Sequence, residues 1–308
     1  MLFDFHASDA GFTDELVSPF ARVRWGVDSE YGHLRDVLLC EPPHLKMVPC
    51  NEVTRDALNK GLACCTDTAE QQHAQLVQVL EAEGVRCHFV APHEGLPDLS
   101  FTRDTVLMSP WGLIELNPRL PHRKAEVAHA VAAVKDLGIP WLASIGEGSV
   151  EGGDVCILKP GVIVIGVSGE RTDEAGAKAL ARQFEQRGWR ALFCRFDRKY
   201  LHLDTLFSVI DRDRAVACIE ALPDEFLIDL IELGIEFIPA SVEEVQKLGA
   251  NLVSLGGGRV LSPADNVRLN QLLDRMGYEV IPVALDQFTR CGGGVHCLTM
   301  PLSRAPGR

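Results

Sequence analysis

The stretch LVQVLEAEGVRCHFV, residues 76–90, decides the fold because its pattern returns four more times along the chain. Apolar residues at helical spacing come first, a glycine ends the helix, and a run rich in β-branched and aromatic residues follows. The other copies are VAAVKDLGIPWLAS (131–144), ARQFEQRGWRALFC (181–194), LIDLIELGIEFIPA (227–240) and LNQLLDRMGYEVIPV (269–283). The helix-ending glycines, 43 to 54 residues apart, are Gly84, Gly138, Gly188, Gly234 and Gly277. A period of this length is typical of repeat folds.

Two further strand-like runs come before each helix, so each unit is expected to be a ββαβ element. The third helix follows DVCILKP and VIVIGVS, and the fifth follows NLVSL and RVLSP. Because such a unit cannot bury a core alone, five of them are expected to pack around a common axis with helices outside. The alternative is a two-domain α/β protein with coincidental spacing.

The sequence therefore predicts one α/β domain over residues 1–308, a propeller with five-fold pseudosymmetry. The final run, GGGVHCLTMPL, begins a sixth unit. We expect a closing strand over 292–303 to pair with unit one, which opens with LRDVLLCEP, so that the fold becomes a ring. The five units are placed at 34–92, 101–145, 151–197, 201–241 and 250–285.

Composition limits the classes of partner. The 308 residues are 46% hydrophobic and 24% charged, with a formal net charge of −13, which is ordinary for a globular protein. Nucleic-acid binding needs a basic face, so we expect no nucleic-acid partner, whereas a small cationic substrate suits an acidic surface. Asp, Glu, Arg or Gly interrupts every hydrophobic run before the length of about 18 residues that a membrane span needs.

Cysteine use and the N-terminus favour a cytoplasmic protein. MLFDFHASDAGFTDEL carries acidic residues where an export signal needs a basic start and an apolar run. The ten cysteines are scattered without a CxxC pair, so we expect reduced thiols and no zinc site. The sequence leaves the oligomeric state open and is compatible with a homo-oligomer.

Polar residues interrupt the apolar runs at the start of four units. These segments are SFTRDTVLM (100–108), VEGGDVCIL (150–158), YLHLDTLFSVI (200–210) and GGGVHCLTM (292–300). Equivalent positions in a ring of units converge on its axis. We therefore expect a nucleophile, a base and carboxylates to face one another across a central cavity, namely Asp104, Glu151, His202, Asp204 and Cys297.

Each of these residues also has a structural interpretation. Asp104 and Asp154 lie in segments where aspartate often caps turns, and His202 lies between two leucines as a core histidine does. Cys297 is distinguished from the other cysteines by the glycines before it, which allow backbone to approach the cavity. His296 is expected on the opposite face of the same strand.

These motifs resemble those of the guanidine-modifying enzymes of the pentein fold. FTRD, EGGD, HLDT and GGGVHCLTMPL are similar in order and character to the motifs of arginine deiminase. LNPRLPHR (116–123) and SGERTDEAG (168–176) resemble the segments of that family that hold the arginine carboxylate. The likeness spans residues 34–303 and agrees with the fivefold repeat.

The resemblance implies a role for each motif residue. Cys297 would be the nucleophile, His202 the general acid and base, and Glu151 the carboxylate beside them. The substrate-binding residues would include two aspartates at the guanidinium and two arginines at the α-carboxylate. The full substrate-binding set is Asp104, Asp204, Arg123, Arg171, Asp98 and Asp154. No metal or organic cofactor is implied.

The implied reaction is hydrolysis of a terminal C–N bond of arginine or an N-methylated arginine through a covalent cysteine thiouronium, giving citrulline plus ammonia or an amine. The first alternative is an amidinotransferase, against which EGGD argues because transferases carry a pattern like DAAD. The second is a non-catalytic arginine-binding protein, which would need neither Cys297 nor His202.

Some positions depart from the arginine deiminase pattern. The chain is shorter than those enzymes, and Asp98 stands where they tend to have Asn, so both features resemble dimethylarginine dimethylaminohydrolase. Gly292 stands where arginine deiminases commonly have Arg. Asp204, however, stands where the dimethylarginine enzymes usually have Lys. A second carboxylate favours an unsubstituted guanidinium that can donate hydrogen bonds on both sides.

Overall fold

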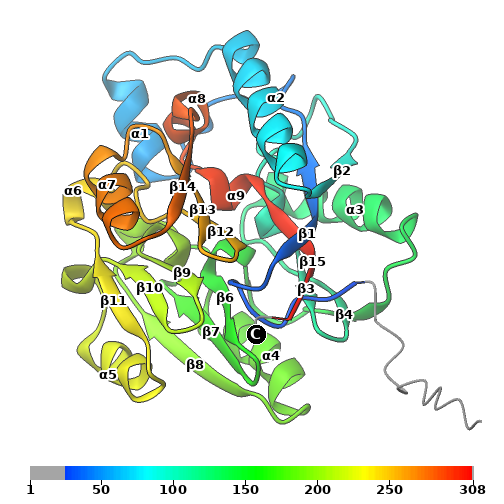
Figure 1. Ribbon diagram of the computed structural model, residues 1–308. Coiled ribbons are helices and arrows are strands. Elements are labelled where there is room, and N and C mark those ends of the chain that lie inside the picture. The colour runs from blue at the N-terminus through cyan, green and yellow to red at the C-terminus, as the bar shows by residue number, and fades with distance from the viewer. Residues whose placement is uncertain (1–24, 307–308) are drawn as a thin grey trace, which may run out of the picture.

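The computed structural model describes residues 25–306 as a ring of small β-sheets with helices around the outside (Figure 1). Residues 1–24 and 307–308, which include the acidic N-terminus and the ends of the predicted domain, lie outside the described part. Within that part, no helix is both long enough and apolar enough to span a bilayer.

Each of the five sheets has three strands and follows one plan. In unit two, β3 (Val106–Ser109) runs antiparallel to β4 (Gly112–Glu115), and β5 (Trp141–Ser144) returns parallel to β4 after α3 (Pro121–Lys135). This is the predicted ββαβ order, and the predicted α/β fold with fivefold pseudosymmetry is confirmed.

The next three units repeat the plan. Unit three contains β6 (Val155–Lys159), β7 (Val162–Val167), α4 (Glu174–Glu185) and β8 (Arg190–Arg195). Unit four contains β9 (Phe207–Asp211), β10 (Arg214–Ala217), α5 (Asp224–Glu232) and β11 (Glu236–Pro239). Unit five contains β12 (Val253–Gly256), β13 (Arg259–Pro263), α7 (Val267–Arg275) and β14 (Glu279–Val283).

The ends of the fold meet in the sheet of unit one. β15 (Met300–Arg304) pairs antiparallel with β1 (Leu34–Cys40), and β1 pairs parallel with β2 (Arg86–Val90), which follows α1 (Glu52–Asn59) and α2 (Thr66–Ala82). The register joins Leu34 to Arg304 and Leu38 to Met300. The expected pairing of the last strand with unit one is confirmed.

The predicted extent of that last strand, 292–303, is wrong at its beginning. Gly292 has a φ of 90°, a left-handed conformation that does not fit a strand. Residues Val295–Leu298 then form a helical turn, α9, in which Asn251 Oδ1 accepts the backbone N–H of His296 at 2.9 Å. The strand begins only at Met300.

The five repeat glycines end their helices for the predicted reason. Their φ values lie between 70° and 90°, a region that costs other residues about 1–2 kcal/mol. A Cβ atom at any of them would meet no atom within 4 Å. Backbone conformation, and not crowding, therefore requires glycine at these positions.

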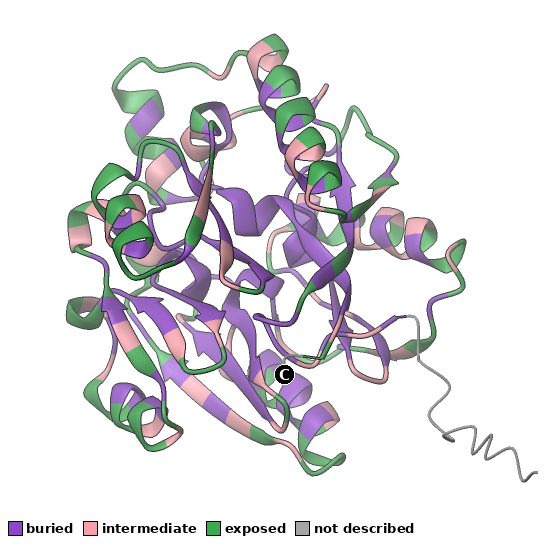
Figure 2. Cartoon of the chain, in the orientation of Figure 1, coloured by how far each residue is buried: buried purple, intermediate pink, exposed green. Residues whose placement is uncertain are grey.

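The core lies between the sheets and the helices (Figure 2). All six residues of β7 are buried, and α2 turns Leu76 and Leu80 inward with no exposed surface. Burial of one such leucine side chain stabilises the fold by about 1.5–3 kcal/mol. The central turn α9 is also entirely buried (Figure 2).

Candidate active site

The polar motifs lie in short turns directly before the first strand of a sheet. The turns η1 (Thr102–Asp104), η2 (Gly152–Asp154) and η4 (Leu203–Thr205) precede β3, β6 and β9, and α9 precedes β15 in the same way. Because η1 contacts α9 and η2, and η2 contacts η4, residues nearly 200 positions apart come together at the centre of the ring. The repeat predicted this convergence.

A cysteine thiol lies at this centre beside a carboxylate and an amide. The Cys297 thiol donates to Asp204 Oδ2 at 3.4 Å, and Asn251 Nδ2 donates to Cys297 Sγ at 3.3 Å. Burial raises the pKa of the thiol well above its usual value, and the carboxylates of Asp204 and Asp104 raise it further. The thiol is therefore protonated at neutral pH unless a cation comes close to it.

The imidazole of His202 lies between two carboxylates. His202 Nε2 is 2.9 Å from Glu151 Oε2 and 3.9 Å from Asp104 Oδ1. Burial lowers the pKa of His202, but the Asp104 charge and the Glu151 hydrogen bond outweigh that effect and raise the pKa to about 10. The ring is therefore an imidazolium at neutral pH, placed to give up a proton.

The paired glycines of EGGD make this approach possible. A Cβ atom on Gly153 would lie 2.7 Å from His202 Nδ1, and one on Gly152 would lie 2.0 Å from the Arg103 carbonyl oxygen. The Gly153 backbone N–H also donates to Asp104 Oδ1 at 2.8 Å. Both glycines therefore allow close packing of one turn against the next.

Two buried arginines hold the carboxylates of the site. Arg123 Nη1 donates to Asp104 Oδ2 at 2.9 Å, and Arg171 Nη1 donates to Glu151 Oε2 at 3.3 Å. Desolvation acts to lower the pKa of each guanidinium, but the neighbouring carboxylates dominate, so both pKa values are raised and both side chains are charged. They supply positive charge to one side of the cavity.

Asp204 has one engaged oxygen and one free oxygen. His296 Nδ1 lies 2.8 Å from Asp204 Oδ2, whereas Oδ1 has no hydrogen-bond partner within residues 25–306. Burial acts to raise the pKa of Asp204, but His296 and His202 lower it below its usual value, so the group is a carboxylate. The prediction that His296 points away from Cys297 across a strand is wrong, because these residues form the helical turn α9.

The two remaining predicted residues lie in different places. Asp98 lines the cavity and its Oδ2 is 2.8 Å from His122 Nε2. Asp154 is not among the residues that line the cavity; its Oδ1 accepts the Leu203 backbone N–H at 2.9 Å. Its contact therefore holds the turn that carries His202 and Asp204.

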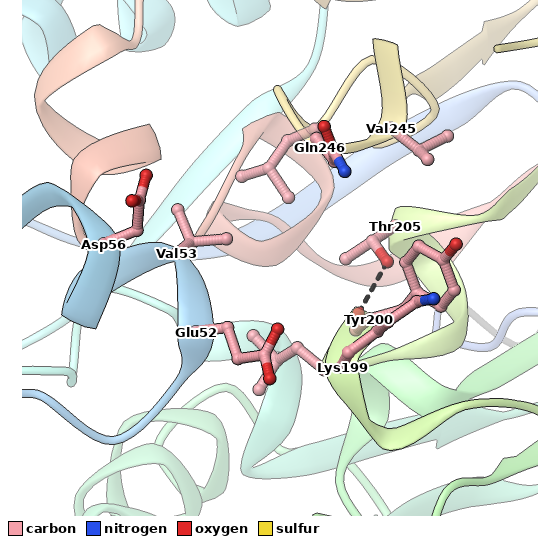
Figure 3. A pocket seen from close by; sticks show the side chains of 10 residues that line it. Glu52, Val53, Asp56, Lys199, Tyr200, Thr205, Val245 and Gln246 are labelled. Carbon is pink, nitrogen blue, oxygen red and sulfur yellow. Dashed lines mark hydrogen bonds between the residues drawn. The ribbon is translucent and has the colours of Figure 1, made fainter. Parts of the chain in front are cut away.

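Most of the predicted residues line one small cavity of about 20 Å³, whose lining does not include Glu151, Asp204 or Asp154. Its predicted members are Cys297, His202, Asp104, Arg123, Arg171 and Asp98. A larger pocket of about 300 Å³ lies nearby, between Glu52 and Asp56 of α1 and the segment of Lys199 and Tyr200 (Figure 3). Leu201 lines both cavities.

Sequence reasoning missed Asn251 and Leu201. Asn251 stands two residues before β12, as Asp104 stands two residues before β3, so the repeat register was a usable signal. Leu201 has a φ of 64°, and the His202 N–H donates to the Tyr200 carbonyl at 2.7 Å, which is a strained γ-turn. No signal in the residue types marks that turn.

Known proteins resemble the chain over most of its length. The N,N-dimethylarginine dimethylhydrolase (eukaryotic) family matches residues 46–304. A dimethylarginine dimethylaminohydrolase of Streptomyces coelicolor is 30% identical over 84% of this chain and 93% of that protein. An arginine deiminase of Mycobacterium marinum is 30% identical over 72% of this chain and 65% of that protein. A Pseudomonas aeruginosa dimethylarginine dimethylaminohydrolase mutant complexed with citrulline shares the fold, with a TM-score of 0.73 at 22% identity over 88% of this chain and 100% of that chain.

Proposed function

The chain belongs to the N,N-dimethylarginine dimethylhydrolase family, and on this premise we propose that it hydrolyses a terminal C–N bond of the guanidinium group of arginine or an N-methylated arginine. Citrulline and ammonia, or citrulline and an amine, would be the products. The family relationship supports a guanidino substrate, and the choice between arginine and methylarginine rests on the site.

One observation carries the proposal. The Cys297 thiol lies 3.4 Å from the carboxylate of Asp204 and close enough to Asp104 for both charges to raise its pKa. A nucleophile that cannot ionise beside two carboxylates becomes reactive when a cation binds between them. A guanidinium is such a cation, and its planar N–H groups match carboxylate acceptors.

The substrate itself would create the thiolate. At about 4 Å and an effective dielectric constant of about 20, a unit charge pair is worth about 4 kcal/mol, which corresponds to a fall of about three units in a thiol pKa. The thiol proton is released to solvent as the guanidinium binds, because His202 is already protonated. Asn251 Nδ2, 3.3 Å from the sulfur, then donates to the thiolate and fixes its direction.

The chemistry would proceed in two halves. Cys297 Sγ attacks the central guanidinium carbon, His202 gives its proton to the departing nitrogen, and the C–N bond breaks to leave a thiouronium on the cysteine. Neutral His202 then takes a proton from a water molecule, the hydroxide attacks the same carbon, and the C–S bond breaks. The product is citrulline, and Glu151 orients the imidazole throughout.

The test is a substrate panel of arginine, monomethylarginine, dimethylarginine and agmatine, with citrulline, ammonia and amines measured. The hydrolase proposal requires citrulline. Parallel reactions with glycine or lysine address the amidinotransferase alternative, because transfer would give ornithine and a new guanidino compound. Binding without any product would leave the non-catalytic alternative.

Arg171 is expected to bind the substrate α-carboxylate. Arg171→Gln should raise KM for arginine by about ten- to a hundredfold, because one charge-assisted contact is worth about 1.5–3 kcal/mol. Agmatine lacks the carboxylate, so it should be a poor substrate and should lose less activity than arginine does in the variant, which also removes the ion pair of Glu151 with Arg171. Arg195→Gln, which removes an exposed arginine paired with Glu174, is the control. Efficient turnover of agmatine by the wild-type enzyme would contradict the assignment of Arg171 to the α-carboxylate. We expect Arg123→Gln to raise KM for arginine in the same way.

The protonation of His202 gives a second test. Its pKa of about 10 means that the charged ring persists through neutral pH and is lost as pH rises through that value. Nitrogen-15 NMR of the free protein should therefore show an imidazolium at pH 7. Glu151→Gln removes a hydrogen bond and a charge, so the transition should move to lower pH, whereas Glu243→Gln at an exposed pair should leave it in place. A ring that is neutral at pH 7 in the wild-type protein would contradict the role of His202 as the acid.

A further inference from the structure

The histidine that precedes Cys297 in the sequence has no part in the reaction described above, although it lies at the centre of the ring. His296 belongs to the helical turn α9 and is buried. Its Nδ1 atom lies 2.8 Å from Asp204 Oδ2, and its Nε2 atom lies 3.8 Å from Glu30 Oε2. Both ring nitrogens therefore face buried carboxylates that come from two other segments of the chain.

The carboxylate of Glu30 is held from its other side by cationic groups. Arg103 Nη2, from the motif FTRD, donates to Glu30 Oε1 at 2.5 Å, and Arg304 Nη2 of β15 lies 4.0 Å from Glu30 Oε2. Burial acts to raise the pKa of Glu30, but the charge of Arg103 and the contact with His296 lower it well below its usual value. Glu30 is therefore an ionised and anchored group against the far side of the imidazole.

The hydrogen bond between His296 and Asp204 has a defined direction. Asp204 is a carboxylate, and a carboxylate can only accept hydrogen bonds. The proton therefore lies on His296 Nδ1, which donates to Asp204 Oδ2. The same oxygen accepts from the Cys297 thiol at 3.4 Å. One imidazole N–H thus holds a carboxylate oxygen next to the proposed nucleophile.

His296 lies outside the cavity that Cys297 lines. Together with Glu30 and Asp204 it lines a separate cavity of about 10 Å³. None of these three residues is in the lining of the cavity that Cys297 shares with His202. The route from the imidazole to the reacting atoms therefore runs through Asp204, whose Oδ2 contacts the sulfur.

We propose that His296 is a positioning residue, which holds the Asp204 carboxylate beside Cys297 and thereby favours an unsubstituted guanidinium as the substrate. The inference rests on the proposed function. A side chain that binds a reacting group is effective only when hydrogen bonds behind it fix its orientation. Without the imidazole N–H, the Asp204 carboxylate can rotate away from the sulfur. Loss of His296 should then resemble loss of the Asp204 charge.

A double-mutant cycle tests this relation. His296→Ala should lower kcat/KM for arginine by about ten- to a hundredfold and should lower kcat/KM for dimethylarginine less. In the Asp204→Asn background the charged acceptor is already lost, so the same change should cost no more than about threefold. His296→Asn supplies an amide N–H near the position of Nδ1 and should restore most of the activity.

A histidine that only stabilises the fold would give a different pattern. His296→Ala would then lower kcat/KM for both substrates by the same factor, and by that factor again in the Asp204→Asn background. Either result would overturn the proposal. His73→Ala removes another buried histidine, whose ring packs against Phe288, and this matched control should leave the ratio of the two substrates unchanged.

Carbon-13 NMR of the Asp204 carboxyl group provides a measurement that needs no turnover, with Asp204→Asn assigning the signal. His296→Ala should raise the pKa of this carboxyl because the carboxylate loses a donor, whereas His73→Ala should leave it in place. Circular dichroism shows that each variant is folded. An unchanged titration in folded His296→Ala would overturn the proposal, whether or not guanidino compounds are hydrolysed. A raised pKa without hydrolysis of any guanidino compound would support the positioning of Asp204 and refute only the proposed function.

Discussion

Cys297→Ser is expected to reduce turnover of arginine or methylarginine by about a thousandfold or more while substrate binding remains measurable. A serine hydroxyl does not ionise when a guanidinium binds, so the attack on the central carbon is lost. The carboxylates of Asp104 and Asp204 are separate from the sulfur and continue to hold the cation. The measurement pairs initial rates with calorimetric binding, and Cys65→Ser, at an exposed cysteine, is the control that should keep its activity.

The covalent intermediate provides the sharper half of this test. Wild-type protein quenched in acid during turnover should carry the mass of an amidino adduct on the peptide that contains Cys297. Two other cysteines, Cys50 and Cys291, line the same cavity. Because Cys291 lies only six residues before Cys297, fragmentation of their shared peptide must assign the adduct to one sulfur. An adduct on Cys50 or Cys291 would reassign the nucleophile, and residual activity of Cys297→Ser above a few per cent would exclude an obligatory thiouronium.

Asp204→Asn is expected to change the choice of substrate. The free oxygen Oδ1 of Asp204 is a charged acceptor without a partner among the described residues, and a guanidinium N–H would satisfy it. A dimethylated nitrogen has no hydrogen to give and would leave the carboxylate desolvated and unpaired. We therefore expect the wild-type enzyme to have a higher kcat/KM for arginine than for asymmetric dimethylarginine.

The asparagine variant should reduce that preference. It has the same shape and keeps the fold, but it loses the charge-assisted contact, so kcat/KM for arginine should fall by about ten- to a hundredfold. The rate with dimethylarginine should fall less. Asp197→Asn removes an exposed carboxylate and controls for net charge. A wild-type preference of tenfold or more for dimethylarginine would show that this reading of Asp204 is wrong.

The fold could be predicted because its signals are local. Each of the five repeat helices is followed by a glycine with a positive φ, and each strand after it is a short run whose composition departs from that of the helix. These features repeat five times, so the number of units and the return of the last strand to β1 followed from the residues alone. The reactive motifs were also visible, because polar side chains at the start of buried strands cost free energy unless they are hydrogen-bonded, and they therefore stand out in an apolar run.

The details of the site depended on contacts that no local pattern encodes. Asn251 reaches Cys297 and the His296 backbone only because α9 is a helical turn, and that turn depends on Asn251 and on the left-handed Gly292. The position of Asp154 behind the His202 turn likewise depends on the packing of η2 against η4. Such mutual dependence becomes visible only when the chain is folded.

The pairing of β15 with β1 has a consequence for folding of the nascent chain on the ribosome. Cys297 lies three residues before the strand that completes the sheet of unit one. The other four sheets are each built from a continuous stretch of chain and can form during synthesis. The proposed nucleophile, Cys297, can be held in place only when β15, which ends at Arg304, has left the exit tunnel and paired with β1. A nascent chain that ends before α9 can therefore hold Asp104, Glu151 and His202 together, but it lacks Cys297 and the strand that completes the sheet of unit one.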